Sequence, residues 1–274
     1  MSQTVRKRTI AEVDRGAGYP LILIPGIQGR WQWMAPTIRA LQVRHRVLSF
    51  SLTSVADGPG AEHSPVFARW MDAIDGILDQ TGLARAVIVG VSFGGLIAAR
   101  YAARRPERTA ALVLVSAPAP IWRPDRQAET YLRRPWASVP AFTWRACRRL
   151  WPEVVAAQSS RRARVRFALE YATRAVRFPI SPPRMADWVR EWKDTDIVAD
   201  CARIRAETLL ITGERHLDQV VPLANTLEYL DLIPHVRHVT LAGTGHVGLV
   251  SKPDEFARLV GDFVEVVERR AHAH

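Results

Sequence analysis

The feature that most constrains the fold is a serine held between glycines, where an apolar run gives way to a helical pattern. Residues 87–101 read VIVGVSFGGLIAARY, and Gly90, Ser92 and Gly94 form a Gly-x-Ser-x-Gly motif. A strand that turns this sharply into a helix leaves no room for a Cβ at either glycine. The serine takes a strained backbone conformation, which lifts its Oγ above the sheet. We therefore predict that Ser92 is a nucleophile on a strand–turn–helix.

Short apolar runs bounded by turn residues recur along the chain and are expected to form strands. The runs are Tyr19–Ile24, Arg46–Phe50, Ala86–Val91, Ala110–Ser116, Thr208–Thr212 and Val236–Leu241. Most are continuous rather than alternating, as is typical of parallel strands buried on both faces. Helical patterns lie at residues 66–80 and 93–105, and a last one starts near Pro253. This alternation predicts an α/β doubly wound sheet.

The alternation stops between residues 121 and 196, a segment rich in arginine, tryptophan and proline. Several short helices broken by proline are expected there. An insertion of this kind would lie over the carboxyl edge of the sheet. We therefore expect residues 1–120 and 197–274 to form one core domain, with residues 121–196 as a helical cap.

The positive charge of the chain is concentrated in this expected cap. The net charge is +11, and residues 122–193 hold sixteen Arg or Lys against six Asp or Glu, a local excess of +10. Residues 161–178 form a candidate basic amphipathic helix. Its apolar face would include Phe167, Ala168, Tyr171, Ala175 and Phe178. A solvated face over a packed one is the ordinary explanation; the alternative is attraction to an acidic partner, an anionic lipid surface or an acyl-carrier domain. Nucleic acid is not expected as a partner, since no reading motif accompanies the charge.

A serine nucleophile needs a general base and an acid that orients it. His246 lies in the segment AGTGHV, beyond the last expected strand and on the sheet edge that Ser92 also occupies. Asp218 follows the preceding strand in the segment ITGERHLDQVVP, 28 positions before His246. The chain order Ser, Asp, His suits this architecture. Glu214 is the rival acid, and we favour Asp218.

An oxyanion hole is the third requirement. One donor would be the N–H of Phe93, and the loop of LILIPGIQG supplies the N–H of Ile27 as the other. Candidate substrate-pocket residues are Gln28, Trp31, Trp122 and Val247. Bulky aromatics near a pocket favour a largely apolar substrate, although most cap tryptophans would simply fill the cap's small core.

Together the segments LILIPGIQG, VIVGVSFGG, LLITGERHLDQVVP and AGTGHVGLVSKPDEF resemble the α/β-hydrolase superfamily, in particular its capped bacterial serine hydrolases and esterases. The family's usual His-Gly is replaced here by Pro25-Gly26, and Asp218 follows Gly213 by five positions instead of about three. The resemblance implies an eight-stranded, mostly parallel sheet with the cap inserted after the sixth strand.

The expected reaction is acyl transfer to water through an acyl-enzyme on Ser92, with a carboxylic ester of a small apolar molecule as the default substrate. A thioester, a lactone or a C–C bond is the alternative. A ligand receptor on the same scaffold, with little turnover, is the second class of function. No metal or organic cofactor is required, and the oligomeric state stays open. Two cysteines, the lack of an export signal and the lack of an apolar run of membrane length favour a cytoplasmic protein.

Overall fold

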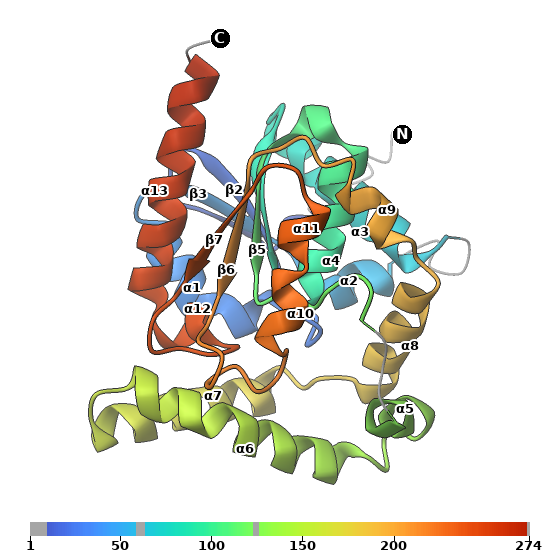
Figure 1. Ribbon diagram of the computed structural model, residues 1–274, viewed down its shortest axis with the longest axis vertical. Helices are drawn as coiled ribbons and strands as arrows, with labels where there is room; N and C mark the ends of the chain where they lie inside the picture. The colour runs from blue at the N-terminus through green and yellow to red at the C-terminus, as the bar shows by residue number, and fades with distance from the viewer. Residues whose placement is uncertain (1–9, 59–63, 123–125, 273–274) are drawn as a thin grey trace, which may run out of the picture.

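The computed structural model describes residues 10–58, 64–122 and 126–272. Its centre is a seven-stranded sheet in the order β1-β3-β2-β4-β5-β6-β7 (Figure 1). The strands are β1 Val13–Arg15, β2 Pro20–Ile24, β3 Arg46–Ser49, β4 Ala86–Val91, β5 Thr109–Val115, β6 Thr208–Thr212 and β7 Val236–Thr240. All neighbours are parallel except β1, which pairs antiparallel with β3. The α/β doubly wound prediction is confirmed, and all six expected runs form strands.

The expected count of eight strands is wrong for the described chain, which has seven. The described residues before β1, which begin at Ile10, add no strand to the sheet. Ile10 packs on the helix α3 Val66–Thr81, where its Cδ1 lies 2.5 Å from the position that a Cβ on Gly76 would take. Its N–H also donates to Gln80 at 3.1 Å. The inserted helices accordingly follow the fifth strand along the chain, not the sixth.

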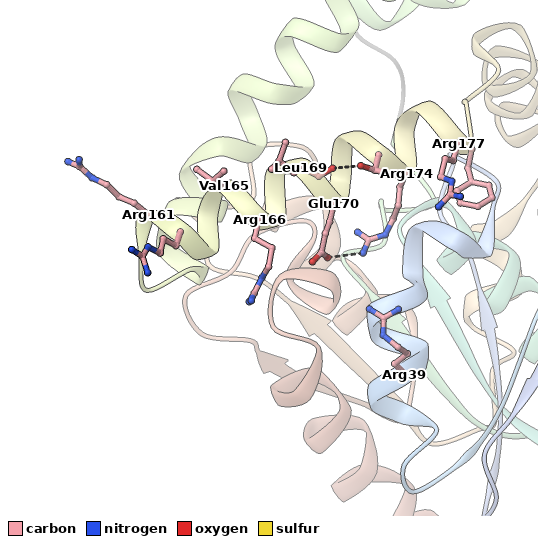
Figure 2. Close-up of a pocket in the computed structure, with 11 residues that line it drawn as sticks. Arg39, Arg161, Val165, Arg166, Leu169, Glu170, Arg174 and Arg177 are labelled. Atoms are coloured by element: carbon pink, nitrogen blue, oxygen red, sulfur yellow. Dashed lines mark hydrogen bonds and ion pairs between the residues drawn. The ribbon is translucent and has the colours of Figure 1, made fainter.

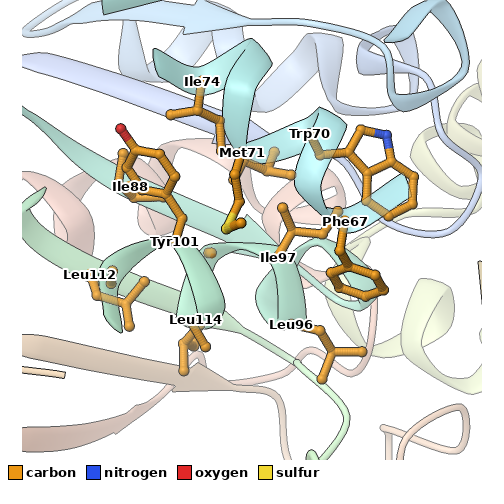
Figure 3. Packing of buried hydrophobic residues seen from close by; sticks show 14 of the residues in the cluster. Phe67, Trp70, Met71, Ile74, Ile88, Leu96, Ile97, Tyr101, Leu112 and Leu114 are labelled. Carbon is orange, nitrogen blue, oxygen red and sulfur yellow. The ribbon is translucent and has the colours of Figure 1, made fainter. Parts of the chain in front are cut away.

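Helices cover both faces of the sheet because successive side chains of each buried strand point to opposite faces. On one face lie α3 and α4 Phe93–Arg104, and Figure 3 shows Trp70 and Tyr101 packing there with strand residues such as Ile88 and Leu114. On the other face lie α1 Ala35–Leu41 and α13 Pro253–His272, against Leu23 and its neighbours. The shorter elements are η1 Trp31–Met34, α2 Leu52–Ala56, η2 Pro106–Arg108, α9 Ile197–Cys201, α10 Leu223–Leu227, α11 Tyr229–Leu232 and α12 Gly248–Ser251.

Between β5 and α9 the described chain forms four helices: α5 Arg126–Arg133, α6 Val139–Ala157, α7 Arg161–Arg177 and α8 Pro182–Lys193. All four fall within the segment expected to form a cap, and Figure 1 shows α6 and α7 lying across one end of the sheet. We refer to these four helices as the cap. None of the helices in the described ranges has an apolar stretch long enough to cross a bilayer.

Proline shapes the cap less than expected. Instead of several short helices, α6 has 19 residues and continues through Pro152, and α7 has 17. A proline inside a helix removes one backbone hydrogen bond and crowds the preceding turn. The turn that follows Pro152 holds Glu153 and Val154, both buried, and these contacts hold the helix together across the lost bond.

Candidate active site

Ser92 lies at the sharp turn between β4 and α4, in a backbone conformation rare for an L-residue. Its φ is 51° and its ψ is −123°, and its N–H donates to the Val115 carbonyl at 2.8 Å. The flanking glycines are required by space. A Cβ on Gly90 would lie 2.5 Å from the Gly94 oxygen, and one on Gly94 would lie 2.5 Å from the Pro25 oxygen. The turn therefore exists only with glycine at both positions, and it holds the serine hydroxyl clear of the sheet.

Three segments distant in sequence bring Ser92, His246 and Asp218 into contact. The Nε2 of His246 lies 3.1 Å from the Oγ of Ser92, and its Nδ1 lies 3.4 Å from Oδ2 of Asp218. The Asp218 Oδ1 accepts the N–H groups of Val220 and Val221 at 3.1 and 3.0 Å. For the serine hydroxyl to donate, Nε2 must be unprotonated, so the ring proton is on Nδ1 and faces Asp218.

The loops that follow β6 and β7 are locked together, which fixes the distance between Asp218 and His246. The N–H of Glu214 donates to the Thr244 carbonyl at 2.8 Å. A Cβ on Gly245 would lie 2.5 Å from the Leu217 oxygen, so the two loops touch through their backbones. Glu214, the rival acid, does not face His246. Its Oε1 accepts the N–H of Gly243 at 2.6 Å, and it serves to bind one loop to the other.

The loop after β2 lies against the serine. The N–H of Gly29 donates to the Gly26 oxygen at 2.9 Å and closes a turn that contains Ile27. The position of a Cβ on Gly26 is 3.4 Å from the Cβ of Ser92 and 3.1 Å from the Oε1 of Gln28, so both side chains border this turn. Phe93 is the first residue of α4, and its N–H therefore has no acceptor inside the helix. The structure thus brings the Ile27 loop and the start of α4 together beside the Ser92 hydroxyl.

A largely apolar cavity of about 160 Å³ opens between this loop and the cap. Ile27 and Trp122 line it together with side chains of α5, α6 and α8, and none of the described residues in this lining is charged. Trp122 stacks on Trp192 with ring centroids 5.0 Å apart, and Trp192 meets the ring of Phe93 at 6.2 Å. An unbroken aromatic path therefore joins the cavity wall to the residue after the serine.

Two of the expected pocket residues have other contacts. Trp31 does not line the cavity: its indole N–H donates to Glu12 at 3.0 Å, and its ring packs on the sheet face covered by α1 and α13. The turn of η1 thus directs the Trp31 side chain toward Glu12 and the face covered by α1 and α13. Val247 is buried and also lies outside the cavity lining. Its N–H donates to both oxygens of Glu153, at 3.1 and 3.0 Å.

Sequence reasoning missed Glu153 and Trp188. Glu153 is fully buried, and burial raises the pKa of its carboxyl while the N–H groups of Val247 and Gly245 act in the opposite direction. It was detectable as the single acid between positions 130 and 169, in a segment crowded with arginine. Trp188 packs over Gly29 and stacks on Phe93 with centroids 6.3 Å apart. Nothing in the sequence distinguishes it from the other cap tryptophans.

The arrangement brings a serine hydroxyl, an imidazole, a carboxylate and the backbone of two loops together at the carboxyl ends of parallel strands. The described residues contain no group of three or more His, Cys, Asp or Glu side chains placed to hold a metal ion.

Comparison with known proteins gives one consistent result. The family pattern described as "alpha/beta hydrolase fold" matches residues 19–253. The 2-hydroxymuconate semialdehyde hydrolase of Pseudomonas sp. strain CF600 is 31% identical over 281 residues, covering 94% of this chain and 91% of that protein. The pimeloyl-[acyl-carrier protein] methyl ester esterase of Aromatoleum aromaticum is 28% identical, covering 85% and 92% of the two chains. The solved enol-lactonase of Burkholderia xenovorans LB400 superposes with a TM-score of 0.71 at 21% identity, over 92% and 95% of the chains.

Proposed function

Because the chain belongs to the α/β-hydrolase family and is a hydrolase by its relatives, we propose that it cleaves a carboxylic ester through an acyl-enzyme on Ser92. The observation that carries the proposal is the hydrogen-bonded series of Ser92, His246 and Asp218 beside a cavity whose described lining is largely apolar. In this proposal His246 is the general base and Asp218 orients its imidazole.

The reaction proceeds in two halves. The Ser92 Oγ attacks the ester carbonyl while its proton passes to Nε2 of His246. The N–H groups of Ile27 and Phe93 stabilise the negative oxygen of the tetrahedral intermediate. Collapse expels the alcohol, which takes the proton from His246. A water molecule, deprotonated by the same imidazole, then attacks the acyl-enzyme, releasing the carboxylic acid and restoring the serine.

The cavity favours an uncharged, apolar acyl or alkyl group. Trp122, Tyr131, Phe142, Met185 and Val189 provide apolar surface, and the few polar atoms in the wall belong to serine, threonine and tyrosine. Burying a carboxylate against such a wall would cost several kcal/mol without a partner charge, on the order of the penalty for an unpaired buried ion. A neutral ester avoids that cost.

Hydrolysis of a C–C bond next to a carbonyl is the second candidate. It is favoured by the 31% identity to a 2-hydroxymuconate semialdehyde hydrolase over nearly the whole chain. The same serine, base and oxyanion donors would serve, but the leaving group would then be a carbanion that requires protonation. The part of the cavity lining that the structure describes carries no charged side chain, and this favours a neutral ester over a charged substrate.

The test combines a covalent probe with turnover. Wild-type protein and Ser92→Ala are treated with a fluorophosphonate, then assayed with p-nitrophenyl esters of increasing acyl length and with 2-hydroxymuconate semialdehyde. We expect labelling and ester turnover in the wild type only, with Ser92→Ala reduced by at least about 10⁴-fold. Equal labelling of the two proteins would refute the proposal. Labelling without turnover of any substrate would instead indicate a receptor. Faster turnover of 2-hydroxymuconate semialdehyde than of the esters would indicate the C–C hydrolase.

A further inference from the structure

The outward side of α7 carries an apolar stripe that the described chain leaves exposed. Val165, Leu169, Ala172 and Val176 follow one another at positions i, i+4, i+7 and i+11, which places them on one line along the helix. The exposed fractions of Val165, Leu169 and Val176 are 59, 64 and 82%. We call these four residues the outer stripe.

The outer stripe is a second apolar face, separate from the one that attaches α7 to the protein. Phe167 and Tyr171 point inward, with stacked rings 6.0 Å apart, and Tyr171 meets Trp33 at 5.0 Å. Ala168 and Ala175, which the sequence pattern assigned to the packed face, are exposed. The helix therefore has its packing partner already, and the outer stripe contributes nothing to the core.

Arginine surrounds the outer stripe. The 17 residues of α7 include six arginines and one acid, Glu170. Arg174 pairs with Glu170 at 3.3 Å. The exposed arginines of α7 are Arg161, Arg162, Arg166 and Arg177, and none of them forms an ion pair within the described ranges. A helix that lies in a membrane interface typically carries cationic side chains beside exposed apolar ones, as α7 does along the outer stripe.

A shallow groove beside α7 concentrates this charge. Figure 2 shows Val165 and Leu169 beside the groove with Arg161, Arg166, Arg174 and Arg177, and Arg39 approaches from α1. The groove has a volume of about 820 Å³. Burial, followed by the nearby charge of Arg39, lowers the pKa of Arg174 even though Glu170 acts in the opposite direction. Cations held this close to one another gain stability when an anion enters between them.

We propose that the face of α7 formed by the outer stripe and its arginines docks onto an anionic lipid bilayer. The arginines would contact headgroup phosphates, and the four apolar side chains would enter the boundary of the acyl chains. An acidic protein would satisfy the arginines but would leave a continuous apolar line along the helix without a role. The combination of charge and exposed apolar side chains on one face therefore favours the bilayer.

Vesicle co-sedimentation tests this proposal. The full chain is mixed with vesicles of phosphatidylcholine alone, or of phosphatidylcholine and phosphatidylglycerol in equal parts, at low and at physiological salt. We expect binding only to the anionic vesicles, with partial loss as salt rises. Val176→Gln and Leu169→Gln should each weaken binding by about fivefold to tenfold, and Arg166→Gln or Arg177→Gln by about fivefold.

Val43→Gln is the matched control for Val176→Gln, since Val43 is 80% exposed but lies outside the cap. It should bind as the wild type does. No binding to anionic vesicles would overturn the proposal. So would binding that both apolar variants leave unchanged: the contact would then be purely ionic, and retention of the protein by polyglutamate would assign the face to an acidic macromolecule.

A second inference rests on a different observation, the buried carboxylate of Glu153. It lies on α6 in the cap, yet both of its oxygens accept the N–H of Val247, the residue directly after His246. Oε1 also lies 3.5 Å from the Ser251 hydroxyl at the end of α12. A carboxylate this deeply buried is retained at a cost in free energy, so its position calls for a compensating role.

We infer that Glu153 is a positioning residue for His246, acting through the backbone of Val247. Its two oxygens hold the peptide that carries the imidazole and so fix the distance from Nε2 to the Ser92 hydroxyl. The cap thereby controls the geometry of the catalytic base as well as the shape of the cavity. This inference rests on the proposed function, since it needs His246 to act on Ser92.

Gln158 provides the matched control. Its Nε2 donates to the Ser251 carbonyl at 2.9 Å, so it joins the end of α6 to the same short helix without touching Val247. We expect Glu153→Ala to lower kcat and the fluorophosphonate labelling rate by about tenfold to 100-fold, with KM changed by less than about twofold. Glu153→Gln keeps an oxygen for the Val247 N–H and should retain most of the rate. Gln158→Ala should label at the wild-type rate.

If Glu153→Ala labels as fast as the wild type, or if Gln158→Ala is slowed equally, Glu153 serves only to anchor the cap and the inference fails. Failure of the proposed function gives a different result, because the wild type itself would then label no more than Ser92→Ala. Thermal unfolding of each variant separates a slowed base from an unfolded protein, and the isosteric Glu153→Gln provides the comparison should the alanine variant be unstable.

Discussion

At the residue scale, two carboxylates on one loop have different contacts, and these decide their roles. Asp218 offers one oxygen to two backbone N–H groups and the other to His246. Glu214 accepts the Gly243 N–H and lies 3.5 Å from His216. In the proposed mechanism, Asp218 and not Glu214 therefore holds the imidazole tautomer that accepts the serine proton.

We predict that Asp218→Asn lowers kcat for ester hydrolysis by about 10⁴-fold, since an amide can present its N–H₂ to Nδ1 and favour the wrong tautomer. Glu214→Gln keeps an acceptor for Gly243 and should stay within about tenfold of the wild type. Steady-state kinetics on a p-nitrophenyl ester measure both. A larger loss in Glu214→Gln than in Asp218→Asn would reverse the two assignments.

The residues that meet at the site could be found from sequence because each follows a strand of a parallel sheet. The ends of such strands converge on one edge, so Ser92, Asp218 and His246 had to lie near one another. Their roles stay proposals. Trp31 could not be placed in the same way, because its direction depends on a single short turn and on the distant partner Glu12.

At the element scale, the turn between β4 and α4 also positions the loop after β2. A Cβ on Gly94 would lie 2.5 Å from the Pro25 oxygen and 2.6 Å from the Ile24 oxygen. Backbone atoms cannot move aside as a flexible side chain can. The added methyl group must therefore push the Ile27 loop away from Ser92.

Gly94→Ala is accordingly expected to lower the free energy of unfolding by about 3 kcal/mol and to abolish most ester turnover. Gly82→Ala is the control. Gly82 has φ +67°, but no atom lies within 4 Å of its Cβ position, so only the backbone strain of about 1 kcal/mol applies. Chemical denaturation of both variants gives the comparison, and equal losses would show that crowding at the turn is unimportant.

The sequence predicts long buried elements better than edges and irregular helices. The runs that became β2, β4, β5 and β6 were detectable because their side chains are mostly apolar. Strand β1 has only three residues, of which Val13 alone is buried, and its pairing with β3 depends on contacts far along the chain. Pro152 predicted a break in α6 that the buried turn after it prevents. Local pattern cannot reveal such tertiary compensation.

At the scale of the whole molecule, stability depends on pH through a histidine at the junction of sheet and helix. His45 precedes β3 and is 5% exposed, and neither ring nitrogen has a hydrogen-bond partner among the described residues. Burial, together with the charge of Arg44, lowers the pKa of His45 below its usual 6.5. The unfolded chain therefore binds this proton more readily than the folded protein does.

The contribution of neutral His45 to the free energy of unfolding is therefore fully present above about pH 6.5. It is lost as the pH falls from there through the lowered pKa of folded His45. His45→Gln removes this loss. As the pH falls from 8 to 5, the free energy of unfolding should decrease less in the variant than in the wild type. Urea titrations at both pH values measure it; the pKa of His238 is also lowered by burial, but that residue is present in both proteins and cancels. A constant difference across the range would contradict the prediction.

The cap and the core together define the cavity, so a substitution on the cap should change substrate selection without changing the chemistry. Ala186 of α8 is buried and lines the cavity, far along the chain from the candidate serine. Ala186→Leu fills part of the volume, and we expect kcat/KM for long-chain p-nitrophenyl esters to fall by about tenfold or more while the acetate stays within about twofold. Ala172→Leu, on the exposed face of α7, should alter neither. If kcat/KM fell equally for esters of every acyl length in Ala186→Leu, the substitution would be disturbing Ser92, His246 and Asp218 or the fold. The cavity would then not be the acyl site.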